Sequence, residues 1–536
     1  LFRPLLMLEP VNLKSYLKML NKKIILIPLI LASFLEARPN VIIILTDDLG
    51  WGDVSYHGGS IPTPNMDKLA SNGIELNRFY ANPTCSPTRA SLLTGLNVFN
   101  HGVIRPFMNP TAEQIGLNKN LKIMPEYFQE AGYQTAMSGK WHLGMHKKEF
   151  RPINRGFETT YGHMLGGLGY FDHVSAGRVD WHRDGIALEE DGYSTELIAN
   201  EAVRIIENKD PKRPLFLYVA FNAPHTPIQA PIKNIENFLH IENLLDRTYA
   251  ANVNKLDLEI GKIIDSIDNA GLLEETIIVF FSDNGPVFDI PAIGQVIAPG
   301  LMEARGSPGK LTGSKMYATE GGIRVPASIW WKGVIENSKT DQFFFVQDLL
   351  PTLLTATGID IDKNIDFDGN NKWGNLLNGN LELPVNDLVA NRVINDERAL
   401  FNNEWKLYYS NPVMISGGAK YSLFNVMNDP YEQNDLSSSN VEIFEQMKIT
   451  MMSMEENNVQ PNINPVKQYL YGDTEGGEIV GSPWLEGDYK TEATPSGFVS
   501  FFVMSWIIFL AFKLQIIGFI CMVVLSRIFY KKFIKS

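Results

Sequence analysis

The run Asn40-Val-Ile-Ile-Ile-Leu45 is followed at once by Thr46-Asp47-Asp48. A continuous apolar run without alternation predicts a β-strand that is buried on both faces, which is typical of a parallel sheet. Similar strands are predicted at 135–137, 215–221 and 276–281, with amphipathic helices between them, for example at 194–208 and 249–270. The sequence therefore predicts an α/β fold with a mostly parallel central sheet.

Polar residues follow each of these strands at its carboxyl end. The later strands lead, in turn, into Lys140 and His142, into His225, and into Asp283 and Asn284. In open α/β sheets, ligands bind beyond the carboxyl ends of the strands. We therefore expect these side chains to meet the two aspartates of the first strand at one edge of the sheet.

A metal site is predicted at that edge. Asp47, Asp48, Asp283 and Asn284 offer only oxygen ligands, which suit Ca²⁺ or Mg²⁺, whereas Zn²⁺ favours histidine or cysteine. Each pair alone could equally be a helix cap or a turn former. Two such pairs after two buried strands favour the metal site.

Composition excludes several classes of protein. The chain has 536 residues, 45% of them hydrophobic and 20% charged, which excludes a disordered, collagen-like or coiled-coil chain. The formal net charge is −13, and the last 39 residues carry five bases and no acid. The chain before these last 39 residues is therefore even more acidic and a poor general binder of nucleic acid. Any anionic substrate needs a local positive site.

The two cysteines are informative because Cys521 lies in an apolar tail, so Cys85 has no disulfide partner in the body of the chain. In Cys85-Ser-Pro-Thr-Arg-Ala-Ser-Leu-Leu-Thr-Gly95, Pro87 suits the first turn of a helix and Gly95 suits its end. Cys85 would then lie at a helix N-terminus, which favours anions, with Arg89 one turn further on. We expect the thiol to be acidified and reactive.

These motifs resemble those of the sulfatase family. Residues 85–95 match the signature C-x-P-S/T-R-x-x-x-L-T-G at every fixed position, and residues 132–144 match the second sulfatase signature. Residues 46–51 and 320–326 are similar to the family too, and the resemblance runs from about Asn40 to Leu436. It implies an alkaline phosphatase-like large domain, about 38–390, and a small C-terminal α+β domain with an antiparallel sheet, about 391–471.

The resemblance also implies roles for the motif residues. Cys85 would be converted to formylglycine by the formylglycine-generating enzyme, and its hydrate would be the nucleophile. Asp47, Asp48, Asp283 and Asn284 would hold Ca²⁺, with Mg²⁺ as the alternative, together with the modified residue 85. Arg89 would stabilise the hydrate, Lys140, His225 and Lys315 would bind the sulfate oxygens, and His142 would help to expel sulfate. The alternatives are a packed core histidine at 142 and solvated lysines at 140 and 315.

Within the family, residues 139–149, 155–157 and 223–231 are most similar to the arylsulfatase B type, an N-acetylgalactosamine-4-sulfatase, and to arylsulfatases I and J. This chain lacks their disulfide cysteines, differs in the loop 286–310, and has Thr312 where an arginine is common. The expected substrate is an aryl sulfate or a sulfated glycosaminoglycan or glycoconjugate, such as N-acetylgalactosamine 4-sulfate. The rivals are a phosphodiester or phosphonate hydrolase, and an inactive membrane-held binder of sulfated glycans.

Both ends of the chain predict the secretory pathway. Met19 opens a signal peptide that ends near Ala37, with Lys22 and Lys23 before an apolar stretch. Residues 472–497 resemble a stalk, the apolar segment 498–526 a single membrane span, and 527–536 a basic cytoplasmic tail. The catalytic body would lie in the lumen or outside the cell, in lysosomes or at the cell surface. The alternatives are a buried strand for the first segment and a wrongly assigned last exon for the second.

Overall fold

The computed structural model describes residues 38–107, 116–145, 147–175, 177–288, 305–362, 365–392, 395–412 and 418–456. The predicted signal region, stalk, membrane segment and basic tail lie outside these ranges. Within them, no helix combines the length and the apolar character needed to cross a bilayer.

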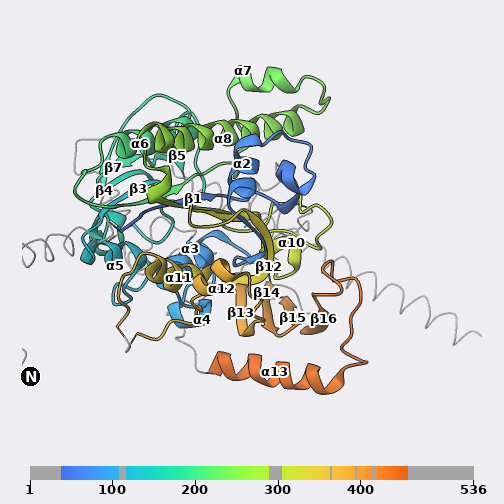
Figure 1. Cartoon of the computed structure of the whole chain (residues 1–536). Coiled ribbons are helices and arrows are strands. Elements are labelled where there is room, and N and C mark those ends of the chain that lie inside the picture. Colours follow the sequence, from blue (N-terminus) through green and yellow to red (C-terminus); the bar gives the residue numbers. More distant parts are fainter. Residues whose placement is uncertain are drawn as a thin grey trace, which may run out of the picture.

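A ten-stranded sheet forms the centre of the large domain (Figure 1). β1 (Asn40–Thr46) lies between β9 (Leu215–Ala220) and β10 (Thr276–Ser282), and both pair with it in parallel. β3 (Gln134–Lys140) and β4 (Thr159–His163) continue in parallel beyond β9. The outer strands are β2 (Ile74–Tyr80), β11 (Ala327–Trp330), β12 (Ser338–Phe345), β7 (His182–Arg183) and β8 (Ile186–Ala187). The predicted mostly parallel central sheet is confirmed.

Helices cover both faces of this sheet, which is why the central strands are apolar throughout. α6 (Ser194–Glu207), α8 (Leu244–Asn269) and α2 (Pro64–Asn72) cover one face (Figure 1). α3 (Cys85–Thr94), α5 (Met124–Glu130) and α11 (Leu349–Ala356) cover the other. Shorter helices are α4 (Val98–His101), α7 (Ile232–Ile235), α10 (Glu320–Ile323) and α12 (Trp373–Asn378), and β5 (Val174–Ser175) pairs with β6 (Arg178–Val179).

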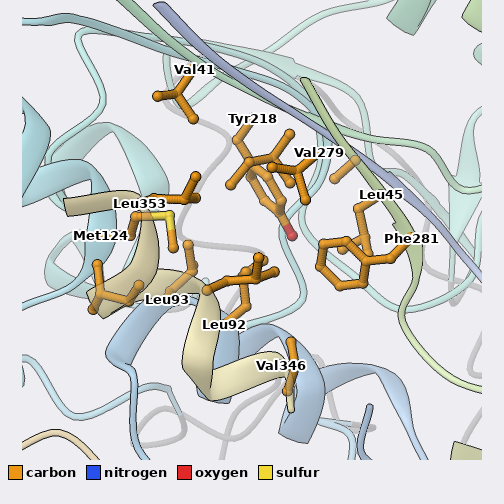
Figure 2. Packing of buried hydrophobic residues seen from close by; sticks show 14 of the residues in the cluster. Val41, Leu45, Leu92, Leu93, Met124, Tyr218, Val279, Phe281, Val346 and Leu353 are labelled. Atoms are coloured by element: carbon orange, nitrogen blue, oxygen red, sulfur yellow. The ribbon is translucent and has the colours of Figure 1, made fainter. Parts of the chain in front are cut away.

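The two faces of β1 belong to two separate hydrophobic clusters. Val41 and Leu45 pack on the side of α3 and α11, where Figure 2 shows Leu92 and Leu353 approaching the sheet. Ile42 packs in the cluster on the side of α6 and α8. This packing fixes α3 under the sheet and its first residue near the carboxyl ends of the strands.

A four-stranded antiparallel sheet lies beside the large domain and is covered by α13 (Val441–Glu456) (Figure 1). Its strands are β13 (Val385–Arg392), β14 (Asn395–Asn402), β15 (Trp405–Pro412) and β16 (Lys420–Asn425). The predicted small antiparallel sheet with one helix is therefore present. The expected boundary at residue 390 falls inside β13, and the domain limits stay a prediction.

Candidate active site

The polar residues that follow the central strands lie together at one edge of the sheet. The Asp47 N–H donates to the Ala223 carbonyl at 3.1 Å, and the Asp283 N–H donates to the Thr46 carbonyl at 3.0 Å. Lys140, at the end of β3, contacts the Asp47 carboxylate at 2.5 Å. The ends of β1, β3, β9 and β10 are thus joined by direct hydrogen bonds.

Four potential metal ligands gather around the start of α3. One ligand atom each from Asp47, Asp48, Cys85 and His225 lies within 4.8 Å of the others. Asp48 has a φ of 67°, a left-handed conformation that non-glycine residues adopt rarely and mostly where the surroundings enforce it. The turn after β1 is therefore held in a specific, unfavourable shape at this site.

The other predicted ligands lie beside this group. Asn284 donates through its amide nitrogen to Asp48 at 2.7 Å, and Asp283 accepts the Asp48 N–H at 3.2 Å. Within the described residues, the buried Oδ1 atoms of Asp47 and Asn284 have no hydrogen-bond partner. Buried acceptors without partners are costly, and a hard cation would satisfy both. The oxygen donors of Asp47, Asp48, Asp283 and Asn284 therefore fit Ca²⁺ or Mg²⁺.

Buried cations balance the carboxylates. Lys315 lies 2.7 Å from Asp48, and both it and Lys140 are nearly inaccessible to solvent. Arg89 is fully buried and donates to Asp283 from Nε at 3.1 Å and from Nη2 at 2.8 Å. The alternative of solvated lysines is thus wrong. Lys310, which is near Lys315 in sequence, is exposed.

Burial and the neighbouring charges shift the pKa values of Asp47 and Asp48, which follow β1, in opposite directions. Burial, reinforced by Asp283, raises the pKa of Asp47 to about 8 although Lys140 opposes the rise. Burial also acts to raise the pKa of Asp48, but Lys315 and His225 outweigh it and lower the pKa to about 2. Asp48 is therefore the carboxylate that stays ionised most firmly.

The two histidines of the site are held neutral. Burial, with Lys315 second, lowers the pKa of His225 to about 3. Burial, then Lys140 and Arg89, lowers the pKa of His142 well below its usual value. His142 Nε2 lies 3.2 Å from the Phe107 carbonyl, which can only accept, so Nε2 carries the hydrogen. Nδ1 is then a lone-pair acceptor, and it has no partner among the described residues.

The expected acidified thiol is wrong. Cys85 does begin α3, and Gly95 ends it with a left-handed φ of 70°, as the sequence predicts. Burial, however, raises the pKa of the Cys85 thiol to about 12, more than the nearby Lys140 and Lys315 can offset. Removal from water therefore outweighs the helix N-terminus, and an unmodified thiol here is a poor nucleophile.

Comparison with known proteins is consistent with this chemistry. The family model described as Sulfatase matches residues 39–359, more than half of the chain. The chain belongs to the sulfatase family. It is a sulfuric ester hydrolase.

Individual relatives cover most of this sulfatase. It is 32% identical over 454 residues to arylsulfatase J of Mus musculus, covering 75% of this chain and 73% of that protein. It is 29% identical over 481 residues to N-acetylgalactosamine-6-sulfatase of Homo sapiens, covering 81% and 89%. These relatives agree with the predicted likeness to arylsulfatases.

Solved structures share the fold. The structure of Ps i-CgsB in complex with k-i-k-neocarrahexaose has a TM-score of 0.69 at 29% identity, covering 79% of this chain and 94% of that chain. The phosphonate monoester hydrolase of Agrobacterium radiobacter has a TM-score of 0.53 at 18% identity, which shows the fold alone. The alkaline phosphatase-like architecture of the large domain is confirmed.

Sequence reasoning missed the segment after β4 in this sulfatase. Met164 accepts the His142 N–H through its carbonyl at 3.0 Å, and the Asp180 carboxylate accepts the Met164 N–H at 3.0 Å. A Cβ on Gly166 would lie 2.5 Å from His142 Cε1, so only glycine leaves room for the ring. The rule of polar residues at strand ends could have found this segment, but β4 is too polar to be recognised as a buried strand.

Proposed function

We propose that this sulfatase is calcium-dependent and uses a formylglycine hydrate derived from Cys85. One observation carries the proposal: Cys85 lies in the same compact group as Asp47, Asp48 and His225, at the start of a buried helix. An unmodified thiol with a pKa raised to about 12 is poorly suited to attack a sulfate ester. Modification of that residue resolves the conflict between its central position and its poor reactivity.

When present, the hydrate supplies a hydroxyl nucleophile and Ca²⁺ supplies Lewis-acid polarisation of a sulfate oxygen. Asp47, Asp48, Asp283 and Asn284 would hold the cation together with residue 85, and Mg²⁺ is the second choice. The unpartnered Oδ1 atoms of Asp47 and Asn284 support this ligand set.

The residues of the chain itself bind and orient the ester. Lys140, Lys315 and His225 would contact the sulfate oxygens, and the two buried ammonium groups favour the charge that develops in the transition state. Arg89 orients Asp283 and would stabilise the hydrate. His142, whose Nδ1 is a free acceptor among the described residues, would take the hydroxyl proton when sulfate leaves.

The proposed substrate is a sulfated glycosaminoglycan or glycoconjugate, such as N-acetylgalactosamine 4-sulfate. The similarity to N-acetylgalactosamine-6-sulfatase, whose name includes a sulfated amino sugar, supports this class. The proposed partners are the formylglycine-generating enzyme during maturation and the membrane through residues 498–526. We propose a location in the secretory pathway, in lysosomes or at the cell surface.

A substrate panel tests the reaction. Full-length protein, produced in cells that contain the converting enzyme, should hydrolyse 4-nitrophenyl sulfate, and Cys85→Ala should not. Preference for bis(4-nitrophenyl) phosphate or a phosphonate monoester would favour the phosphodiester or phosphonate rival. Binding of sulfated glycans without any hydrolysis would favour the inactive binder.

A second panel tests the sugar and the anchor. The protein should release sulfate from N-acetylgalactosamine 4-sulfate, and release from neither the 4-sulfate nor the 6-sulfate would overturn the proposed sugar class. Truncation after Gly497 should leave activity unchanged and move the protein from the detergent phase to the aqueous phase. Full-length protein already in the aqueous phase would contradict the anchor.

A further inference from the structure

Met316, the residue after Lys315, has an unfavourable backbone. Its φ is 78°, in the left-handed region, and it is buried. A non-glycine residue keeps such a conformation only where its surroundings hold it firmly. Because Lys315 precedes it directly, whatever holds Met316 also fixes the backbone that carries the Lys315 ammonium.

Two hydrogen bonds hold the Met316 backbone. Its N–H donates to the Pro83 carbonyl at 2.8 Å, and its carbonyl accepts from Asn391 Nδ2 at 3.2 Å. Asn391 Oδ1 in turn accepts from the Thr84 hydroxyl at 2.9 Å. Pro83 and Thr84 immediately precede Cys85, so one side-chain amide joins the neighbours of Cys85 and Lys315.

Asn391 belongs to the small sheet, not to the large domain that supplies the other site residues. It lies near the end of β13, pairs with Glu397 of β14, and is 1% exposed. The adjacent Ala390 N–H donates to Asn82 Oδ1 at 3.3 Å, which ties the same strand to the same loop. The small sheet is thereby connected both to residues 82–84, which precede Cys85, and to Met316, which follows Lys315.

We propose that Asn391 is a positioning residue that sets the separation between residue 85 and the Lys315 ammonium. This inference rests on the proposed function, because it assigns a purpose to that separation. Binding the sulfate group between a nucleophile and a cation requires both at the correct distance, and a shift of about 1 Å can cost about 10²-fold in rate. The buried amide fixes this distance from outside the large domain.

Asn391→Ala removes both hydrogen bonds, and Leu400→Ala is the matched control. Leu400 is fully buried in β14 of the same sheet and packs in the cluster with α13, on the face of the sheet opposite Asn391. Loss of stability in the sheet is therefore common to both variants, whereas loss of the bridge is not. Thr84→Val and Thr84→Ser separate the hydroxyl from the shape of the side chain, since only serine keeps the donor.

The experiment measures kcat and KM for 4-nitrophenyl sulfate on full-length proteins. Each kcat is divided by the fraction of protein that carries formylglycine, found by mass spectrometry. Asn391→Ala should lower kcat by about 10-fold to 10²-fold, whereas Leu400→Ala should stay within about twofold at an equal or larger fall in Tm. Thr84→Val should fall and Thr84→Ser should retain activity. The rise in Tm caused by millimolar sodium sulfate, against sodium chloride, should shrink in Asn391→Ala and persist in Leu400→Ala.

The outcomes are distinguishable. If Asn391→Ala and Leu400→Ala have equal kcat and an equal sulfate-induced rise in Tm, Asn391 is merely structural and the inference is overturned. If Asn391→Ala does not fold, Thr84→Val decides, because an activity equal to that of Thr84→Ser rejects the bridge. If the formylglycine-bearing wild type cleaves no sulfate ester, the proposed function itself fails.

Discussion

Removal of the Asp283 carboxylate should destabilise the fold as well as stop turnover. Asp283 and Arg89 are both inaccessible to solvent, and two guanidinium nitrogens donate to one carboxylate oxygen at 2.8 and 3.1 Å. Asp283→Ala therefore leaves a buried cation with both donors unpaired. Breaking a buried ion pair from one side costs about 3–5 kcal/mol.

The double variant Asp283→Ala/Arg89→Met removes both charges with an apolar side chain of similar length. Replacement of a whole buried pair by apolar residues is often neutral, so most of the loss should return. The cost that only the double variant carries is the Lys140 carbonyl, which accepts from Arg89 Nη1 at 2.8 Å and would lose its partner, roughly 1 kcal/mol. The double variant should therefore be more stable than Asp283→Ala by about 2 kcal/mol.

Urea unfolding followed by circular dichroism measures this difference. The buffer should contain a chelator, because Ca²⁺ bound to the folded state would add its own stabilisation. Both variants should lack sulfatase activity, because both lack the Asp283 carboxylate. The comparison therefore concerns the free energy of unfolding alone. A double variant that is no more stable than Asp283→Ala would refute the reasoning that each buried charge offsets the desolvation cost of the other.

Three further predictions follow from the same site and its surroundings. Lys315→Ala should lower kcat/KM by about 10²-fold to 10³-fold because a buried cation proposed to bind the sulfate is lost, whereas exposed Lys310→Ala should stay within about twofold; equal effects of the two substitutions would contradict the role proposed for Lys315. Burial raises the pKa of Asp53 to about 7, so its contribution to stability, present in acid, is lost as the pH rises through 7. Tm should therefore fall between about pH 4 and pH 7 and level off above it, and Asp53→Asn should make that fall smaller; an unchanged fall would contradict the assignment. Chelation should abolish activity and lower Tm, with recovery on addition of Ca²⁺ but not Zn²⁺, and stoichiometric zinc in active protein would exclude the oxygen-ligand site.

Local sequence patterns were sufficient where burial on both faces or a helix end decided the structure. The apolar runs of β1, β9 and β10 gave the central sheet, and Gly95 marked the end of α3. α8 begins at Leu244, earlier than its apolar pattern indicated, because Asn243 caps it through its side chain. Element ends of this kind depend on single capping residues rather than on periodicity.

Long-range contacts and burial could not be predicted in the same way. The Thr84–Asn391 bond joins residues 307 positions apart, and neither residue belongs to a recognisable motif. The thiol of Cys85 looked acidified from its place at a helix N-terminus, but the depth of the site, which no local pattern reports, raises its pKa instead. The sequence predicted correctly which edge of the sheet carries the polar site residues. It did not predict the long-range hydrogen bonds that hold their loops.

The mass of the peptide that contains Cys85, taken from active protein, tests the central claim most directly. Oxidation of the CH₂SH side chain to an aldehyde lowers the mass by about 18 Da, and the fraction converted should scale with the rate of 4-nitrophenyl sulfate hydrolysis. Cys85→Ser should remain at its unmodified mass or accumulate as a sulfated protein, with little turnover. Active protein whose Cys85 is an unmodified thiol would contradict the account.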